Sequence, residues 1–101
     1  MKIELNENLK DLSGKDIVEN GKIIPLKEVL ANSIVNSKEI AGIDSTLRCH
    51  VIGVELFKTG IMELTAGERQ AINEFIEKRA GYSILVKYQI QKIIEAAEKK
   101  P

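Results

Sequence analysis

Cys49 and His50 are the only neighbouring residues that could act as a nucleophile and a base. A cysteine nucleophile needs its base within hydrogen-bonding distance, whereas consecutive side chains of a helix point about 100° apart. Cys49 also lies on an apolar stripe of a predicted helix, where a thiol behaves as a small hydrophobic side chain. We therefore predict a structural role for Cys49, and the position of His50 requires no catalytic role.

Other kinds of catalytic or binding site lack their usual residues. One cysteine and one histidine cannot complete a structural zinc site on their own, and the acidic residues show neither calcium-loop spacing nor a His-Glu-x-x-His motif. The seven glycines form neither a phosphate-binding loop nor a dinucleotide fingerprint. We therefore expect no enzyme, with no catalytic residue, no metal site and no cofactor.

The charge distribution leaves one alternative function, nucleic-acid binding. The chain carries 15 basic and 15 acidic residues, so no net charge steers it towards nucleic acid or an acidic membrane. From residue 78 onward, however, there are six basic residues and two acidic ones. A basic helix end also suits the helix dipole, which is the simpler explanation. The candidate contacts for nucleic acid are Lys78, Arg79, Lys87 and Lys92.

A short motif bears on the same alternative. The segment 64–70 resembles the opening of helix-turn-helix segments in sigma-factor-like and response-regulator proteins, although much of it is a capping box. If Gly81 is the turn glycine, Glu77 stands where a small residue is needed and Lys87 where an apolar one is needed. The segment 84–86, which is Ile-Leu-Val, is also ill suited to contact bases. Nucleic acid is therefore the alternative and not the expected partner.

Length and composition favour a single domain over residues 1–101. Apolar residues make up 44% of the chain and aromatic residues only 4%, so the core must consist mainly of Ile, Leu and Val. No apolar run reaches the roughly 18 residues of a membrane span, and the N-terminus lacks a signal-peptide pattern. A single cysteine excludes an internal disulfide and fits a reducing compartment. We expect a cytoplasmic protein without membrane contact.

Asn20-Gly21 predicts a β-hairpin, because this pair supplies the positive φ angles of a two-residue type I′ turn. A hairpin alone is marginally stable, so it needs a further strand or a helix against one face. Two segments, 2–5 and 61–64, are candidates for a third strand beside it. The predicted register has three pairs, which are Glu19 with Lys22, Val18 with Ile23, and Ile17 with Ile24.

The first two helices differ in their apolar patterns. The first follows Pro25 and has one apolar face, whereas the second runs from Asp44 or Ser45 to about Lys58 and is apolar on two sides. Gly53 in its middle allows another backbone to approach closely, or else marks a kink. One stripe of the second helix contains Leu47, Val51, Val54 and Phe57. The opposite stripe contains Cys49, Ile52 and Leu56, and this is the candidate interface with another subunit.

Two more helices complete the chain. Thr65 and Glu68 have the spacing of a capping box at the start of the third helix, and Gly81 is a candidate C-terminal cap. The fourth helix begins near Tyr82 or Ser83. Because the connection is short, we expect the last two helices to form a helical hairpin. The predicted fold class is therefore α+β, with an N-terminal β-hairpin of two or three short strands followed by four helices.

Parts of the sequence resemble a group of small proteins encoded in tailed phages and prophages. The resemblance spans most of the chain, but its motifs are structural and bring no known site residues. It implies an accessory protein in a bacterial cytoplasm that acts in particle assembly or in binding another protein. The similar segments are Leu9-Lys10-Asp11-Leu12-x-Gly14-Lys15, Asn20-Gly21-Lys22, Leu26-x-x-Val29-Leu30-Ala31-Asn32 and Leu85-Val86-Lys87-x-Gln89.

These observations favour a non-enzymatic protein–protein interaction or assembly protein. The main reasons are the absence of catalytic patterns and a helix with two apolar sides in a short chain. We expect a homo-oligomer, with a heterologous protein partner as a further candidate.

Overall fold

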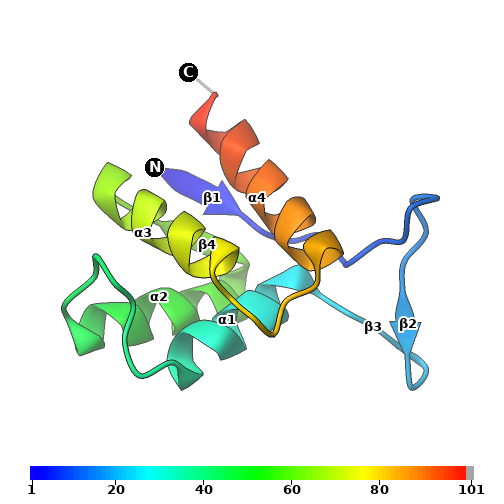
Figure 1. Ribbon diagram of the computed structural model, residues 1–101, viewed down its shortest axis with the longest axis horizontal. Coiled ribbons are helices and arrows are strands. Elements are labelled where there is room, and N and C mark those ends of the chain that lie inside the picture. Colours follow the sequence, from blue (N-terminus) through cyan, green and yellow to red (C-terminus); the bar gives the residue numbers. More distant parts are fainter. Residues whose placement is uncertain (100–101) are drawn as a thin grey trace.

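The computed structural model describes residues 1–99 and confirms the α+β class (Figure 1). Four short strands form two separate two-stranded sheets, and four helices pack around one of them. The elements in chain order are β1 (Lys2–Glu4), β2 (Val18–Glu19), β3 (Lys22–Ile23), α1 (Leu26–Asn36), α2 (Thr46–Thr59), β4 (Ile61–Glu63), α3 (Ala66–Glu77) and α4 (Ile84–Glu98).

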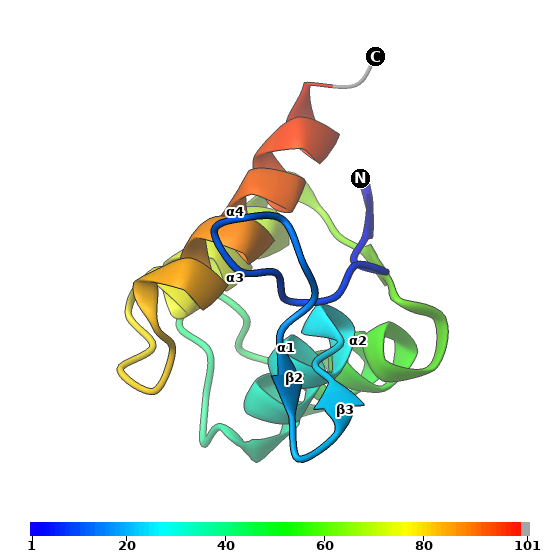
Figure 2. The same cartoon turned by 90° about the vertical axis from the view of Figure 1, so that its right-hand side faces the viewer.

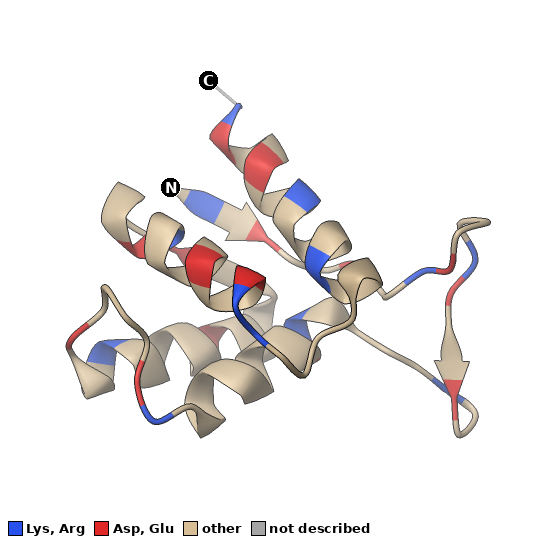
Figure 3. Ribbon diagram, viewed as in Figure 1, with Lys and Arg blue, Asp and Glu red and all other residues tan. Residues whose placement is uncertain are grey.

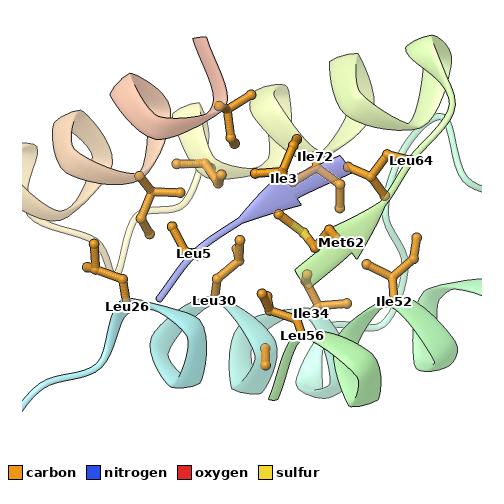
Figure 4. Close-up of a cluster of buried hydrophobic side chains, with 14 of the residues drawn as sticks. Ile3, Leu5, Leu26, Leu30, Ile34, Ile52, Leu56, Met62, Leu64 and Ile72 are labelled. Atoms are coloured by element: carbon orange, nitrogen blue, oxygen red, sulfur yellow. The ribbon is translucent and has the colours of Figure 1, made fainter. Parts of the chain in front are cut away.

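The sheet of β1 and β4 lies inside the fold, between the α1–α2 pair and the α3–α4 pair (Figures 1 and 4). The two strands are antiparallel, with Ile3 opposite Met62, and both of these side chains are buried. The prediction that either strand joins the hairpin is therefore wrong. The reason is burial, because Ile3 and Met62 need an apolar environment and every residue of the hairpin strands is exposed.

The hairpin itself is confirmed, and it extends away from the helices (Figure 1). Asn20 and Gly21 have φ angles of 51° and 78°, as the type I′ turn requires. The predicted pairs of residues 18 with 23 and 19 with 22 are both present. The pair of residues 17 and 24 is wrong, because Leu9 lies between them. The N–H of Ile17 donates to the carbonyl of Leu9 at 3.0 Å, and the N–H of Leu9 donates to that of Ile24 at 2.8 Å.

The loop that leads into the hairpin is fixed to α4. Figure 2 shows this loop passing beside the helix. The side-chain amide of Gln89 accepts a hydrogen bond from the N–H of Lys10 at 3.0 Å and donates to its carbonyl at 2.6 Å. The carboxylate of Asp11 accepts hydrogen bonds from the backbone N–H groups of Ser13 and Lys15, which closes the loop.

Helices α1 and α2 pack closely along the side that contains Gly53. A Cβ atom on Gly53 would lie 2.5 Å from Cγ1 of Val35 and 3.5 Å from the carbonyl oxygen of Ala31. Close approach of the two helices therefore explains this glycine. Helix α2 begins after Ser45, one of the two predicted starts, whose hydroxyl accepts from the N–H of Arg48, and Gly60 ends the helix with a φ of 75°.

Helices α3 and α4 form the predicted helical hairpin, with contacts at both ends. Arg69 in the first turn of α3 forms an ion pair with Glu98 in the last turn of α4. At the other end, the side-chain amide of Gln91 donates to the Glu77 carboxylate at 2.8 Å. The capping box is present, but the prediction that Gly81 caps α3 is wrong. The helix already ends at Glu77, and Gly81 has no positive φ angle.

The core is aliphatic, as the composition predicts, and it includes residues from all four helices (Figure 4). Leu30, Leu56, Ile72 and Ile90 have no exposed surface. Burial of one such side chain contributes roughly 1.5–3 kcal/mol to stability. No polar or charged residue is buried within residues 1–99, and no helix described there is long and apolar enough to cross a bilayer.

Candidate interaction surface on the second helix

The structure reverses the expected roles of the two apolar stripes of α2. Ile52 and Leu56 are buried in the core of this chain, with 3% and 0% of their surface exposed (Figure 4). Cys49 packs partly buried against the same core, and its thiol donates to the carbonyl of Ile43 over 3.6 Å. Burial raises the pKa of this thiol, so it is a poor nucleophile. The expectation that these three residues form a subunit interface is therefore wrong.

The opposite stripe of α2 is exposed instead. Leu47 is 73% exposed, Phe57 is 49% exposed and Val51 is 40% exposed, with a half-buried Val54 between them. These residues follow spacings of three and four, so their side chains are neighbours on one side of the helix. Val35 of α1, 42% exposed, extends this surface across the contact at Gly53. We call these five residues the α2 outer face.

Gly53 was a signal in the sequence that another helix approaches α2. It stands one turn from Cys49 and one turn from Phe57, so it lies at the border between the two stripes and does not by itself show which of them is buried. The close approach that it permits is that of α1. The exposure of Val35 could not be predicted from the sequence, because it depends on how α1 lies against α2.

A charged network fixes the start of α2 to the rest of the fold. The Nε and Nη2 atoms of Arg48 donate to the two carboxylate oxygens of Glu68 at 2.7 and 2.9 Å. Nη2 also donates to the carbonyl of Glu63 at 2.7 Å, and the backbone N–H of Thr65 donates to Glu68. Hydrogen bonds from Arg48 are the main reason that the pKa of Glu68 falls to about 2. The network therefore joins α2 to β4 and α3.

Charged residues are sparse on the helical layer that carries the outer face. In Figure 3, α1 and α2 are mostly tan, whereas α4 carries blue and red segments along its length. From residue 29 to the end of α1 there is no charged residue, and α2 carries only Arg48, Glu55 and Lys58. Arg48 is paired with Glu68, so the charged residues that border the outer face are Glu55, one turn from Val51, and Lys58, one turn from Val54.

Three of the four candidate nucleic-acid contacts lie around the C-terminal end of α3, and the fourth, Lys92, lies further along α4. The Arg79 guanidinium lies over the Phe75 ring, 5.3 Å from its centre. The Lys87 ammonium donates to the carbonyl of Glu77 at 2.8 Å, at the end of α3. Lys92 lies 5.7 Å from the centre of the Tyr88 ring on α4, while Lys78 is exposed at the end of α3. Two of the four side chains are thus engaged in contacts that support α3.

Comparison with known proteins returns no match, whether the chain is compared with protein-family models, with curated proteins or with solved structures. Within residues 1–99, no three His, Cys, Asp or Glu side chains are grouped so that they could hold a metal ion.

Proposed function

We propose that this protein is a non-enzymatic interaction protein that assembles through the α2 outer face, and that its partner there is a second copy of the chain. The observation that supports the proposal is the exposure of Leu47, Val51 and Phe57 on one side of a helix. Contiguous exposed apolar surface is unusual in a monomer and is typical of protein interaction sites.

The outer face is held rigid before any partner binds. Ser45 and Gly60 define the two ends of α2, Arg48 fixes its first turn to Glu68, and Gly53 presses it against α1. A rigid surface loses little conformational entropy on association, so more of the binding free energy is retained. The exposed stripe runs from residue 47 to residue 57, which spans about 15 Å along the helix.

The charges on α2 favour pairing with an antiparallel copy. Lys58 lies at one end of the stripe and Leu47 at the other, eleven residues away. A two-fold axis would place Lys58 of one copy beside Leu47 of the second copy, where the lysine methylenes cover apolar surface. Parallel pairing would instead bring the two Lys58 ammonium groups together. The resemblance to small phage-encoded proteins supports an assembly role of this kind.

Light scattering on a size-exclusion column tests the proposal. We expect a dimer for the wild type and a monomer for Leu47→Glu at the same micromolar concentration. The matched control is Ile84→Glu, because Ile84 is 87% exposed at the start of α4 and lies outside the outer face. This control should remain dimeric. A wild type that is monomeric at all concentrations, or a Leu47→Glu dimer of unchanged stability, would contradict the proposal.

A further inference from the structure

The turn of the β2–β3 hairpin contains the one asparagine of the chain that is followed by a glycine. Asn20 and Gly21 are both exposed, and the hairpin extends away from the helices (Figures 1 and 2). A Cβ atom on Gly21 would have no other atom within 4 Å, so no other part of the chain packs against this side of the turn. The turn is therefore open to water.

An asparagine that precedes a glycine can cyclise. The backbone nitrogen of the glycine attacks Cγ of the asparagine, and the ring that forms has five members. Glycine has no side chain that would hinder this approach. Asn36 is instead followed by a serine, and its side-chain amide donates to the carbonyl of Asn32 at 2.8 Å. The side-chain amide of Asn20 has no such partner within residues 1–99, so it is free to react.

The folded turn delays this reaction, because the hairpin must open before the ring can close. Asn20 and Gly21 have φ angles of 51° and 78°, and a type I′ turn also fixes the ψ angle of its first central residue. Ring closure requires Asn20 to rotate out of this conformation. The hairpin resists little, since it has only two residue pairs, all exposed, and a two-stranded hairpin alone is marginally stable. We therefore expect frequent local opening.

The reaction consumes one water molecule and releases ammonia. Hydroxide removes the proton from the backbone nitrogen of Gly21, this nitrogen forms a bond to Cγ of Asn20, and the bond between Cγ and Nδ2 breaks. The departing nitrogen takes a proton from water and leaves as ammonia, which regenerates hydroxide. Water then opens the cyclic imide. Cleavage of the bond from nitrogen to Cγ gives aspartate, and cleavage of the bond from nitrogen to the backbone carbonyl carbon gives isoaspartate.

The two products should affect the hairpin differently. Aspartate keeps the original main chain, and Asp-Gly also suits a type I′ turn. In isoaspartate the main chain passes through the side-chain methylene, so the turn gains one backbone atom. Because the turn sets the register of the strands, the pairs Val18–Ile23 and Glu19–Lys22 should be lost. Each product also adds one carboxylate to a chain with 15 basic and 15 acidic residues.

We propose that Asn20 is a site of spontaneous modification, at which water converts the asparagine to aspartate and isoaspartate, and that the isoaspartyl form opens the β2–β3 hairpin. The helices and the central sheet should stay folded, because the hairpin strands contribute no residue to the buried core. The inference goes beyond the α2 outer face, since it concerns another part of the molecule and a covalent change.

Peptide mapping of the full chain tests the modification. The purified protein is kept warm at mildly alkaline pH, and a lysine-specific protease then releases residues 16–22 as one peptide. Mass spectrometry after chromatography quantifies its asparaginyl, aspartyl and isoaspartyl forms, and a sample digested at time zero corrects for conversion during digestion. The reference is the same heptapeptide, acetylated and amidated, in the same buffer. Because opening an exposed segment costs little free energy, we expect Asn20 in the protein to react at most about tenfold more slowly than in the peptide.

Asn36 is the internal control, and it should react much more slowly than Asn20 in the same samples. A delay at Asn20 larger than tenfold relative to the peptide, or equal conversion at the two asparagines, would overturn the inference.

NMR separates the effect of isoaspartate from that of the added charge. The Asn20→Asp variant has the added carboxylate without the longer main chain. Its Hα–Hα cross-peak between Val18 and Ile23, which are directly opposed, should persist. The isoaspartyl protein, isolated by chromatography, should lack this cross-peak. A cross-peak retained in the isoaspartyl protein, or lost in Asn20→Asp as well, would overturn the opening of the hairpin and leave the outer-face proposal untouched.

Discussion

The two apolar stripes of α2 are alike in composition but differ in what surrounds them. Ile52 and Leu56 contact the central sheet and α1, whereas Leu47 and Phe57 point away from the fold. The pattern of apolar residues therefore indicates that a helix has two hydrophobic sides, but not which side the chain itself covers. The side that becomes buried is decided by the elements that pack against α2, which are α1 and the central sheet.

Substitutions in the two stripes should differ most in how much they lower the free energy of unfolding of the protein. We expect Leu56→Ala to lower the free energy of unfolding by about 2–5 kcal/mol, because it leaves a cavity in the core. Leu47→Ala should change it by no more than about 0.5 kcal/mol under conditions where the protein is monomeric. Urea denaturation followed by circular dichroism measures both values. Equal losses from the two variants would show that the stripes do not differ as described.

Gly53 lies between the two stripes, and replacing it with alanine should change the free energy of unfolding. Alanine normally stabilises the middle of a helix by about 1 kcal/mol relative to glycine. Here the added Cβ would lie 2.5 Å from Cγ1 of Val35, so we expect Gly53→Ala to destabilise the protein by about 1–3 kcal/mol. The double variant Gly53→Ala/Val35→Ala should recover most of this loss in the same denaturation assay. Stabilisation by the single variant would contradict the close approach of α1 and α2.

The Arg48–Glu68 network at the start of α2 should make a smaller, pH-dependent contribution to the free energy of unfolding. The pKa of Glu68 is about 2 in the folded protein, below its ordinary value of 4.5. The lowered pKa means that its stabilising effect is fully present above pH 4.5 and disappears as the pH falls towards 2. Because the pair is partly exposed, we expect a contribution of roughly 1–2 kcal/mol. Glu68→Gln should remove this part of the acid dependence in urea titrations between pH 2 and 6. An unchanged acid dependence in this variant would exclude the network as its source.

The features that depend on local chemistry could be predicted from the sequence. The Asn20-Gly21 turn, the Thr65–Glu68 capping box and the Ser45 cap each depend on residues close together in the chain. The pairing of β1 with β4 joins residues about 60 positions apart, and no local pattern specifies it.

Disulfide trapping is the sharpest test of whether two copies pair through the α2 outer face in antiparallel orientation. In a Cys49→Ala background, mixing the Leu47→Cys and Lys58→Cys variants under mild oxidation should give a covalent heterodimer. Neither variant alone should cross-link efficiently, because the two-fold axis brings position 47 beside position 58 of the other copy. Efficient cross-linking of Leu47→Cys to itself, or no cross-linking of the mixture, would contradict antiparallel pairing through the outer face.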